Sequence, residues 1–366
     1  MSNRIKIYGA GSIGNHLAQA SRTLGWEVTV CDLDGAALKR MQGEIYPSRY
    51  GAWDPAIRLC LNGDAPRGGF DLIAIGTPPE HHLALALDAL KEAPRAILAE
   101  KPACPPHMNH AAELLAAAKA AGVRAFVGYD HVVGRAAALA TGIARSGEIG
   151  EVVALDVEFR EHWEGIFRAH PWLSGPQDTY LGYWERGGGA SGEHSHALNL
   201  WQHFAHVFGF GRVLEVEAMA TYVREGAAIF DSIMSWNLRT ESGFQGRVVQ
   251  DVLTRPSRKR CRIQGSRGTV EWVANHTPEG DAVFVRLPGA PEREVKVAKK
   301  RPDDFIEELT HVWASVTSGT DSPLGLERGL DTALVVAAGH ESERLKTRVR
   351  MDWSAGHKRE AIVPCR

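Results

Sequence analysis

The sequence predicts an α/β fold, in which a doubly wound parallel sheet is followed by an α+β domain with one large, open, mostly antiparallel sheet. Three observations predict it. Apolar runs alternate with helical stretches up to residue 128, a glycine-rich turn follows the first apolar run, and closely spaced strand-like runs fill the chain after residue 212. The length of 366 residues exceeds one ordinary core, so we expect two domains, 1–128 and 129–366.

In the first domain, each apolar run is short and is followed by a segment with helical periodicity. This alternation predicts parallel strands joined by right-handed helical crossovers. The expected strands are 5–8, 28–31, 70–75, 96–99 and 125–127, and the expected helices are 13–24, 35–41, 80–92 and 107–121.

In the second domain, strand-like runs are separated by Gly, Pro and Asn turns, which is typical of antiparallel pairing. A loop-rich aromatic segment at 160–186 precedes most of these strands. The expected helices are 132–146, 190–208, 303–318 and 325–345, and the expected strands are 151–160, 213–223, 228–239, 244–253, 260–265, 268–273, 282–287 and 294–298.

The composition excludes several classes of protein. Hydrophobic residues make up 44% and charged residues 23%, and the net charge of −2 gives no basic footprint for nucleic acid. No apolar run is long enough to cross a bilayer, and a strand that starts at Ile5 leaves no room for a signal peptide. The five cysteines lack metal-type spacing and are expected as reduced thiols, so we expect a cytoplasmic protein.

The glycine-rich turn lies between the first strand and the first helix, which is the context of a dinucleotide-binding (Rossmann) site. Gly9 permits the tight turn, Gly11 lets the backbone approach a pyrophosphate, and Gly14 allows the helix to pack closely on the strand. The N–H groups at the start of the helix face the anion, so the predicted pyrophosphate site comprises Gly9, Gly11, Ser12, Ile13 and Gly14.

Asp32 ends the second predicted strand, where a carboxylate accepts hydrogen bonds from the adenosine ribose and repels a 2′-phosphate. The expected cofactor is therefore NAD rather than NADP. Ligands of such sheets lie beyond the carboxyl ends of the strands, so the turns after the next two strands should border the cofactor. From these turns and the helix between them we expect contacts from Thr77, Pro78, His82, Glu100 and Lys101.

Lys101 lies directly after a predicted strand, and Pro102 restricts its backbone. An amine held at this edge of the sheet is suited to sharing a proton with a substrate hydroxyl. A second group of reactive side chains lies within 187–199, where three consecutive glycines let the backbone pass close to a ligand. If a helix begins near Ser191, then Glu193, His196 and Asn199 line one face of it.

Those three side chains suit a proton acceptor with an orienting partner, which makes Lys101, His196, Glu193 and Asn199 the candidate catalytic residues. The His-x-His and Glu-x-x-His spacings match no metal signature, so no metal is expected. The aromatic segment 160–186 suits a polyhydroxylated ring, since its aromatic faces are flanked by hydrogen-bond donors. A packed loop that supports the sheet is the alternative for any single member of that segment.

The order of these motifs along the chain resembles the glucose–fructose oxidoreductase/inositol dehydrogenase (Gfo/Idh/MocA) family of NAD(P)-dependent enzymes. The motifs are the glycine turn, Thr77-Pro78, Glu100-Lys101-Pro102, Gly128-Tyr129-Asp130-His131 and 187–199. The resemblance implies that Lys101 is the catalytic lysine, His196 the acid/base histidine and Glu193 the carboxylate. It departs from the family at Asn199, commonly Asp, at Val132, where Arg is expected, and in the spacing of Glu193 and His196.

The resemblance implies that the protein oxidises a secondary hydroxyl of a sugar, sugar derivative or cyclitol by hydride transfer to NAD. The expected substrate-binding residues are His131, Arg160, Trp163, Tyr183 and His196. Alternatives on the same fold are an NAD-dependent glycoside hydrolase, a sugar-nucleotide dehydrogenase and a non-catalytic dinucleotide sensor. We expect a homo-oligomer, a dimer or a tetramer, because the broad open sheet needs cover.

Overall fold

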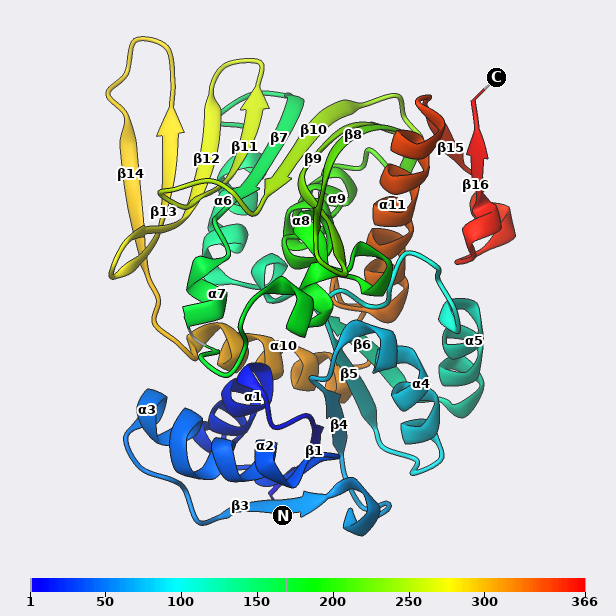
Figure 1. Ribbon diagram of the computed structural model, residues 1–366. Coiled ribbons are helices and arrows are strands. Elements are labelled where there is room, and N and C mark those ends of the chain that lie inside the picture. The colour runs from blue at the N-terminus through cyan, green and yellow to red at the C-terminus, as the bar shows by residue number, and fades with distance from the viewer. Residues whose placement is uncertain (1, 169, 366) are drawn as a thin grey trace.

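The computed structural model describes residues 2–168 and 170–365 and contains two sheets. Figure 1 shows the smaller sheet with the N-terminal helices at one end of the molecule and the larger sheet at the other. The smaller sheet has six strands and the larger one has ten, which confirms the predicted fold class.

The first sheet is parallel throughout, in the order β3-β2-β1-β4-β5-β6. Its strands β1, β4 and β5 consist almost entirely of buried residues, because helices cover both faces of a doubly wound sheet. The strands are β1 (Arg4–Tyr8), β2 (Glu27–Asp32), β3 (Ile57–Leu61), β4 (Leu72–Ile75), β5 (Ala96–Glu100) and β6 (Arg124–Gly128). The main helices of this half are α1 (Ser12–Thr23), α2 (Gly35–Arg40), α4 (Pro79–Leu90) and α5 (Ala111–Ala121).

Two features of this half differ from the prediction. The edge strand β3 was not predicted, and neither was the helical insertion before it, which consists of a π-helical turn at Met41–Ile45 and α3 (Tyr46–Tyr50). Helix α5 begins at Ala111 and not at residue 107, because His110 has φ 65° and this left-handed conformation cannot continue a helix.

The second sheet has the order β14-β13-β12-β11-β7-β10-β9-β8-β15-β16, and its only parallel pair among the described residues is β7 with β10. Its predicted strands are all present, with small shifts at their ends, and two short C-terminal strands are added. The strands are β7 (Val152–Arg160), β8 (Val213–Glu225), β9 (Ala228–Thr240), β10 (Gln245–Asp251), β11 (Arg258–Gly265), β12 (Thr269–Thr277), β13 (Gly280–Arg286), β14 (Arg293–Ala298), β15 (Val349–Met351) and β16 (Ile362–Pro364).

The helix expected over 190–208 is two helices. The amide of Ser195 bonds to the carbonyl of Gly192, and the amide of Ala197 bonds to that of His194. These tighter i→i−3 bonds separate the two helices. The helix expected over 132–146 begins later, at Arg135, after a 3-10 turn at Asp130–Val132. The helices of this half are α6 (Arg135–Arg145), α7 (Glu164–Arg168), α8 (Gly189–Glu193), α9 (His196–Val207), α10 (Asp303–Ser318) and α11 (Leu326–Leu345).

The C-terminal helices return to the first domain. Helix α10 packs against α1, helix α11 contacts both β6 and β8, and the amide of Val127 bonds to the carbonyl of Leu324. Figure 1 shows α10 lying across the molecule between the two sheets. Strand β6 ends at Gly128, the predicted end of the first domain, and the turn that follows it, Asp130–Val132, contacts α9 and α10. None of the described helices is long and apolar enough to span a membrane.

Candidate active site

The glycine turn is shaped by backbone contacts that a side chain would disturb. Gly9 has φ 104°, and a Cβ on Gly14 would lie 1.9 Å from the carbonyl oxygen of Gly9. A Cβ on Gly11, by contrast, would meet no atom within 4 Å. The turn therefore leaves open space above Gly11 at the N-terminus of α1, where main-chain N–H groups and the helix dipole favour a pyrophosphate.

Asp32, at the end of β2, is hydrogen-bonded to the backbone of the glycine turn. Its Oδ2 accepts a hydrogen bond from the amide of Ala10 at 2.7 Å, and its Oδ1 accepts one from the amide of Asp34 at 2.8 Å. The carboxylate is thus fixed beside the glycine turn, as a ribose-binding carboxylate requires. The residues of the turn and the strand end fit a bound dinucleotide.

His82 connects two loops of the site. It is fully buried, with Nδ1 3.0 Å from the carbonyl oxygen of Pro102 and Nε2 2.6 Å from that of Thr77. Burial lowers its pKa to about 4, although the two carbonyls act in the opposite direction. Both ring nitrogens face the main chain, so in this structure His82 ties the Thr77 turn to the segment that carries Lys101.

Lys101 contacts Glu193, another of the predicted catalytic residues. Its Nζ donates to the backbone carbonyl of Glu193 at 3.0 Å and lies 3.3 Å from Oε2 of the same residue. Glu100, next to Lys101, is buried, and burial raises its pKa to about 8 against the opposing charge of the lysine. The site therefore holds an amine that contacts one carboxylate and lies beside a second, buried carboxyl group whose pKa is raised.

His196 begins α9, and its nearest acidic partner is Asp130. Its Nδ1 is buried and lies 3.6 Å from Oδ1 of Asp130, while Nδ1 of His131 lies 2.5 Å from the same oxygen. The two imidazole rings stack, with centroids 4.3 Å apart. Burial and then the neighbouring His131 lower the pKa of His196 well below its usual value, which keeps the imidazole neutral at neutral pH.

Asn199 faces away from this group. Its Nδ2 donates to Oγ1 of Thr332 at 3.1 Å, and it lines a cavity of about 840 Å³ behind α9 together with Gln202 and His203. The helix break moreover places Glu193 on α8 and His196 on α9. The single helical face that was expected to carry Glu193, His196 and Asn199 is therefore not formed.

The predicted substrate-binding aromatic segment makes mainly internal contacts. Trp163 is buried in a small apolar cluster with Phe230, and Nε of Arg160 pairs with Oδ2 of Asp251 at 2.5 Å. The hydroxyl of Tyr183 donates to the carbonyl of Gln177 at 3.1 Å. Substrate contacts of Arg160, Trp163 and Tyr183 remain predictions.

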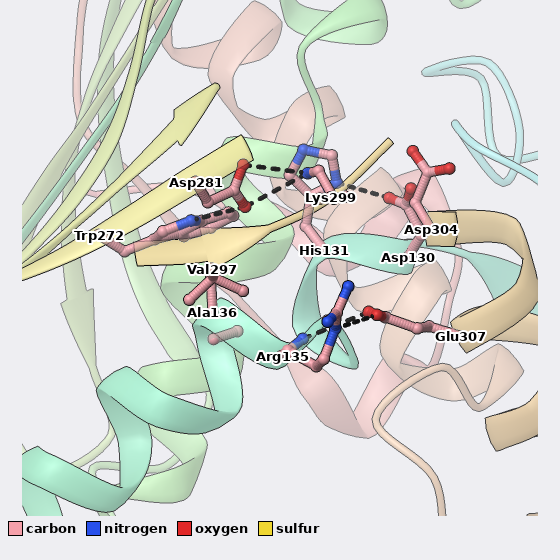
Figure 2. A pocket seen from close by; sticks show the side chains of 12 residues that line it. Asp130, His131, Arg135, Ala136, Trp272, Asp281, Val297, Lys299, Asp304 and Glu307 are labelled. Atoms are coloured by element: carbon pink, nitrogen blue, oxygen red, sulfur yellow. Dashed lines mark hydrogen bonds and ion pairs between the residues drawn. The ribbon is translucent and has the colours of Figure 1, made fainter. Parts of the chain in front are cut away.

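Asp130 and His131 also line a small pocket on the side of the second sheet (Figure 2). The pocket has a volume of about 20 Å³, which is room for one water molecule, and Asp281 and Lys299 lie opposite His131. Asp130, His131 and His196 place ligand-type atoms within 4.8 Å of one another. The expectation that the site holds no metal stays a prediction.

Two residues of the site were not predicted. Asp130 was recognised only as part of a motif, although a buried acid directly before a candidate histidine is a usable signal. Arg49, from the unpredicted insertion, donates from Nη1 to the carbonyl of Ser12 at 3.0 Å and so places a cation beside the glycine turn. No sequence signal pointed to Arg49, because its position depends on how α3 folds back onto α1.

Two family models match the chain. The model described as "Oxidoreductase family, NAD-binding Rossmann fold" matches residues 4–129, and the model described as "GFO/IDH/MocA C-terminal domain" matches residues 138–271. No curated protein matches the chain by sequence.

Solved structures resemble this one along nearly its whole length. A levoglucosan dehydrogenase in complex with NADH has a TM-score of 0.78 at 16% identity, with 96% of this chain and 99% of that chain covered. An oxidoreductase from Agrobacterium radiobacter in complex with NAD+, L-tartaric acid and magnesium has a TM-score of 0.74 at 20% identity, with 96% and 98% covered. An aldose–aldose oxidoreductase from Caulobacter crescentus complexed with glycerol has a TM-score of 0.74 at 19% identity, with 96% and 100% covered.

Proposed function

This chain belongs to the GFO/IDH/MocA family of NAD-binding oxidoreductases, and we propose that it oxidises a secondary hydroxyl of a sugar, sugar derivative or cyclitol. One observation carries the proposal. The amine of Lys101 and the imidazole of His196 come from different segments to the carboxyl edge of the first sheet, beside a turn that fits a dinucleotide. The similar structures include a levoglucosan dehydrogenase and an aldose–aldose oxidoreductase, whose names support a carbohydrate substrate.

In this mechanism a bound NAD supplies the hydride acceptor. Neutral His196 takes the hydroxyl proton on Nε2, because its Nδ1 is buried against Asp130. Lys101 has three N–H donors, of which two are directed at Glu193, so the third is available to the substrate oxygen. A hydrogen bond from that donor stabilises the negative charge that develops on the oxygen as the hydride leaves.

The test is a panel of sugars, anhydrosugars, cyclitols and nucleotide sugars, followed by the absorbance of NADH. A ketone that forms together with NADH supports the dehydrogenase. Glycosidic cleavage without net NADH would instead indicate the hydrolase, and tight NAD binding without turnover would indicate a sensor.

Lys101→Ala is expected to reduce kcat by about 10³-fold or more and to leave the Kd for NAD nearly unchanged. Lys91→Ala is the matched control, because Lys91 is an exposed lysine that pairs with Asp88 on the surface. Full activity of the Lys101 variant would refute its role.

We also propose that the protein forms a homo-oligomer through the second sheet. Met219 on β8 and Leu253 after β10 are 76% and 53% exposed, and a second subunit packed on this sheet would cover them. Light scattering on the purified protein measures the mass of the particle, and a monomer at micromolar concentration would contradict this proposal.

A further inference from the structure

The buried nitrogen of His196 has one acidic neighbour. Nδ1 is inaccessible to solvent and makes no hydrogen bond, and the nearest carboxylate oxygen is Oδ1 of Asp130 at 3.6 Å. Tyr129 packs against the ring of His196 at nearly a right angle, and His131 stacks on it. Since 14% of the side chain stays exposed, Nε2 is the nitrogen that remains for a ligand in the cleft.

Asp130 is held in place and ionised. Nδ1 of His131 lies 2.5 Å from the carboxylate, and the whole residue is buried. Burial raises the pKa of Asp130, but the charge and hydrogen bond of His131, together with the charge of Arg301, outweigh this effect and hold the pKa well below its usual value. A fixed buried anion therefore faces the imidazole at the pH of the cell.

The two residues that the sequence predicted as orienting partners of His196 make hydrogen bonds to other residues. Glu193 receives Nζ of Lys101, and Asn199 donates to Thr332. Asp130 comes from the turn after β6 and reaches the ring from a different part of the chain.

We propose that Asp130 is the acid partner of His196. Its carboxylate accepts the Nδ1–H of the neutral ring, which fixes the tautomer that presents the Nε2 lone pair to the substrate, and it stabilises the imidazolium after proton transfer. The separation of 3.6 Å closes to a hydrogen bond in the reacting complex, where such contacts tighten. His131, on the same oxygen, keeps the carboxylate in position.

This inference rests on the proposed function only for its kinetic test. Asp130→Asn keeps the shape of the side chain but removes its charge, and its amide can donate to Nδ1 and so favour the Nε2–H tautomer, which cannot accept the proton. We expect kcat to fall by about 10²-fold or more, with KM changed less than about threefold and the Kd for NAD unchanged. Glu307→Gln, which removes another carboxylate from the same pocket, is the matched control and should keep wild-type kinetics.

A second measurement needs neither substrate nor turnover. Nitrogen NMR of the protein labelled with ¹⁵N-histidine reports which ring nitrogen of His196 carries the proton, with His196→Gln used to assign the signal. We expect the Nδ1–H tautomer at pH 7 in the wild type and a shift towards Nε2–H in Asp130→Asn.

The outcomes separate the two proposals. An Nε2–H tautomer in the wild type, or Asp130→Asn with wild-type kcat on a good substrate, overturns the pairing of Asp130 with His196. The expected tautomers without turnover of any substrate in the panel support the pairing and count against the dehydrogenase.

Discussion

Gly11 and Gly14 lie in the same turn, yet Gly14→Ala should lower the stability of the fold, whereas Gly11→Ala should weaken the binding of NAD. In Gly14→Ala the new Cβ lies 1.9 Å from the carbonyl oxygen of Gly9, against about 3.4 Å for an ordinary contact, so the turn must open by about 1.5 Å. The two nearest atoms, the carbonyl oxygen and carbon of Gly9, belong to the backbone and cannot rotate away as a side chain could. We expect the free energy of unfolding to fall by about 3 kcal/mol, at the upper end of overpacking costs.

In Gly11→Ala the new Cβ meets no atom within 4 Å, and the backbone of Gly11, with φ −74°, accommodates alanine. The fold should keep its stability. The methyl group occupies the space predicted for the pyrophosphate, so the Kd for NAD should rise at least about tenfold, which corresponds to about 1.4 kcal/mol.

Urea unfolding and titration calorimetry with NAD, performed on both variants and the wild type, measure the two quantities separately. The reasoning is refuted if Gly11→Ala binds NAD with the wild-type Kd, because the pyrophosphate would then lie elsewhere. Wild-type stability of Gly14→Ala would show that the turn is not packed as described.

Three further predictions concern charged groups. Burial raises the pKa of Asp231 to about 7, so its contribution to stability is full below its unfolded pKa and is lost as the pH rises towards 7. Urea unfolding should show the wild type losing about 2 kcal/mol relative to Asp231→Asn between pH 5 and pH 7, and a constant difference would contradict this. Glu92→Gln should cost about 3–5 kcal/mol, because it leaves the fully buried Lys6 without its carboxylate, whereas Lys6→Met combined with Glu92→Leu should recover most of that loss in the same assay. Asp32→Ser should lower the preference for NAD over NADP at least about tenfold in binding titrations, and an unchanged ratio of the two Kd values would remove Asp32 from that role.

The parts of the fold that the sequence predicted are those in which local pattern and burial agree. Strands β1, β4 and β5 are continuous apolar runs, and they are buried on both faces. Strand β3 escaped prediction because it is a mostly half-buried or exposed edge strand, and Arg58 interrupts its apolar pattern. The C-terminal strands β15 and β16 have only three residues each, too few for a periodic signal.

The candidate site was predicted where a motif lies at the end of a strand, and less well where it depends on tertiary packing. The glycine turn and Lys101 follow directly from strands β1 and β5. The side chains of 193–199 were expected on one helical face, but two i→i−3 bonds turn the chain between Glu193 and His196. The helical periodicity of the sequence does not show that break. The residue nearest to Nδ1 of His196, Asp130, could therefore not be predicted from the spacing of residues along one helix.

The break between α8 and α9 allows Lys101 and His196 each to contact a different carboxylate. A continuous helix would place Glu193 and His196 on one face and let them compete for the same partner. The turn instead directs Glu193 towards Lys101 and His196 towards Asp130. On the proposed mechanism each group then keeps its own carboxylate, so the amine remains a hydrogen-bond donor while the neutral imidazole remains the base. Loss of Asp130 should therefore impair proton transfer without disturbing the contact between Lys101 and Glu193.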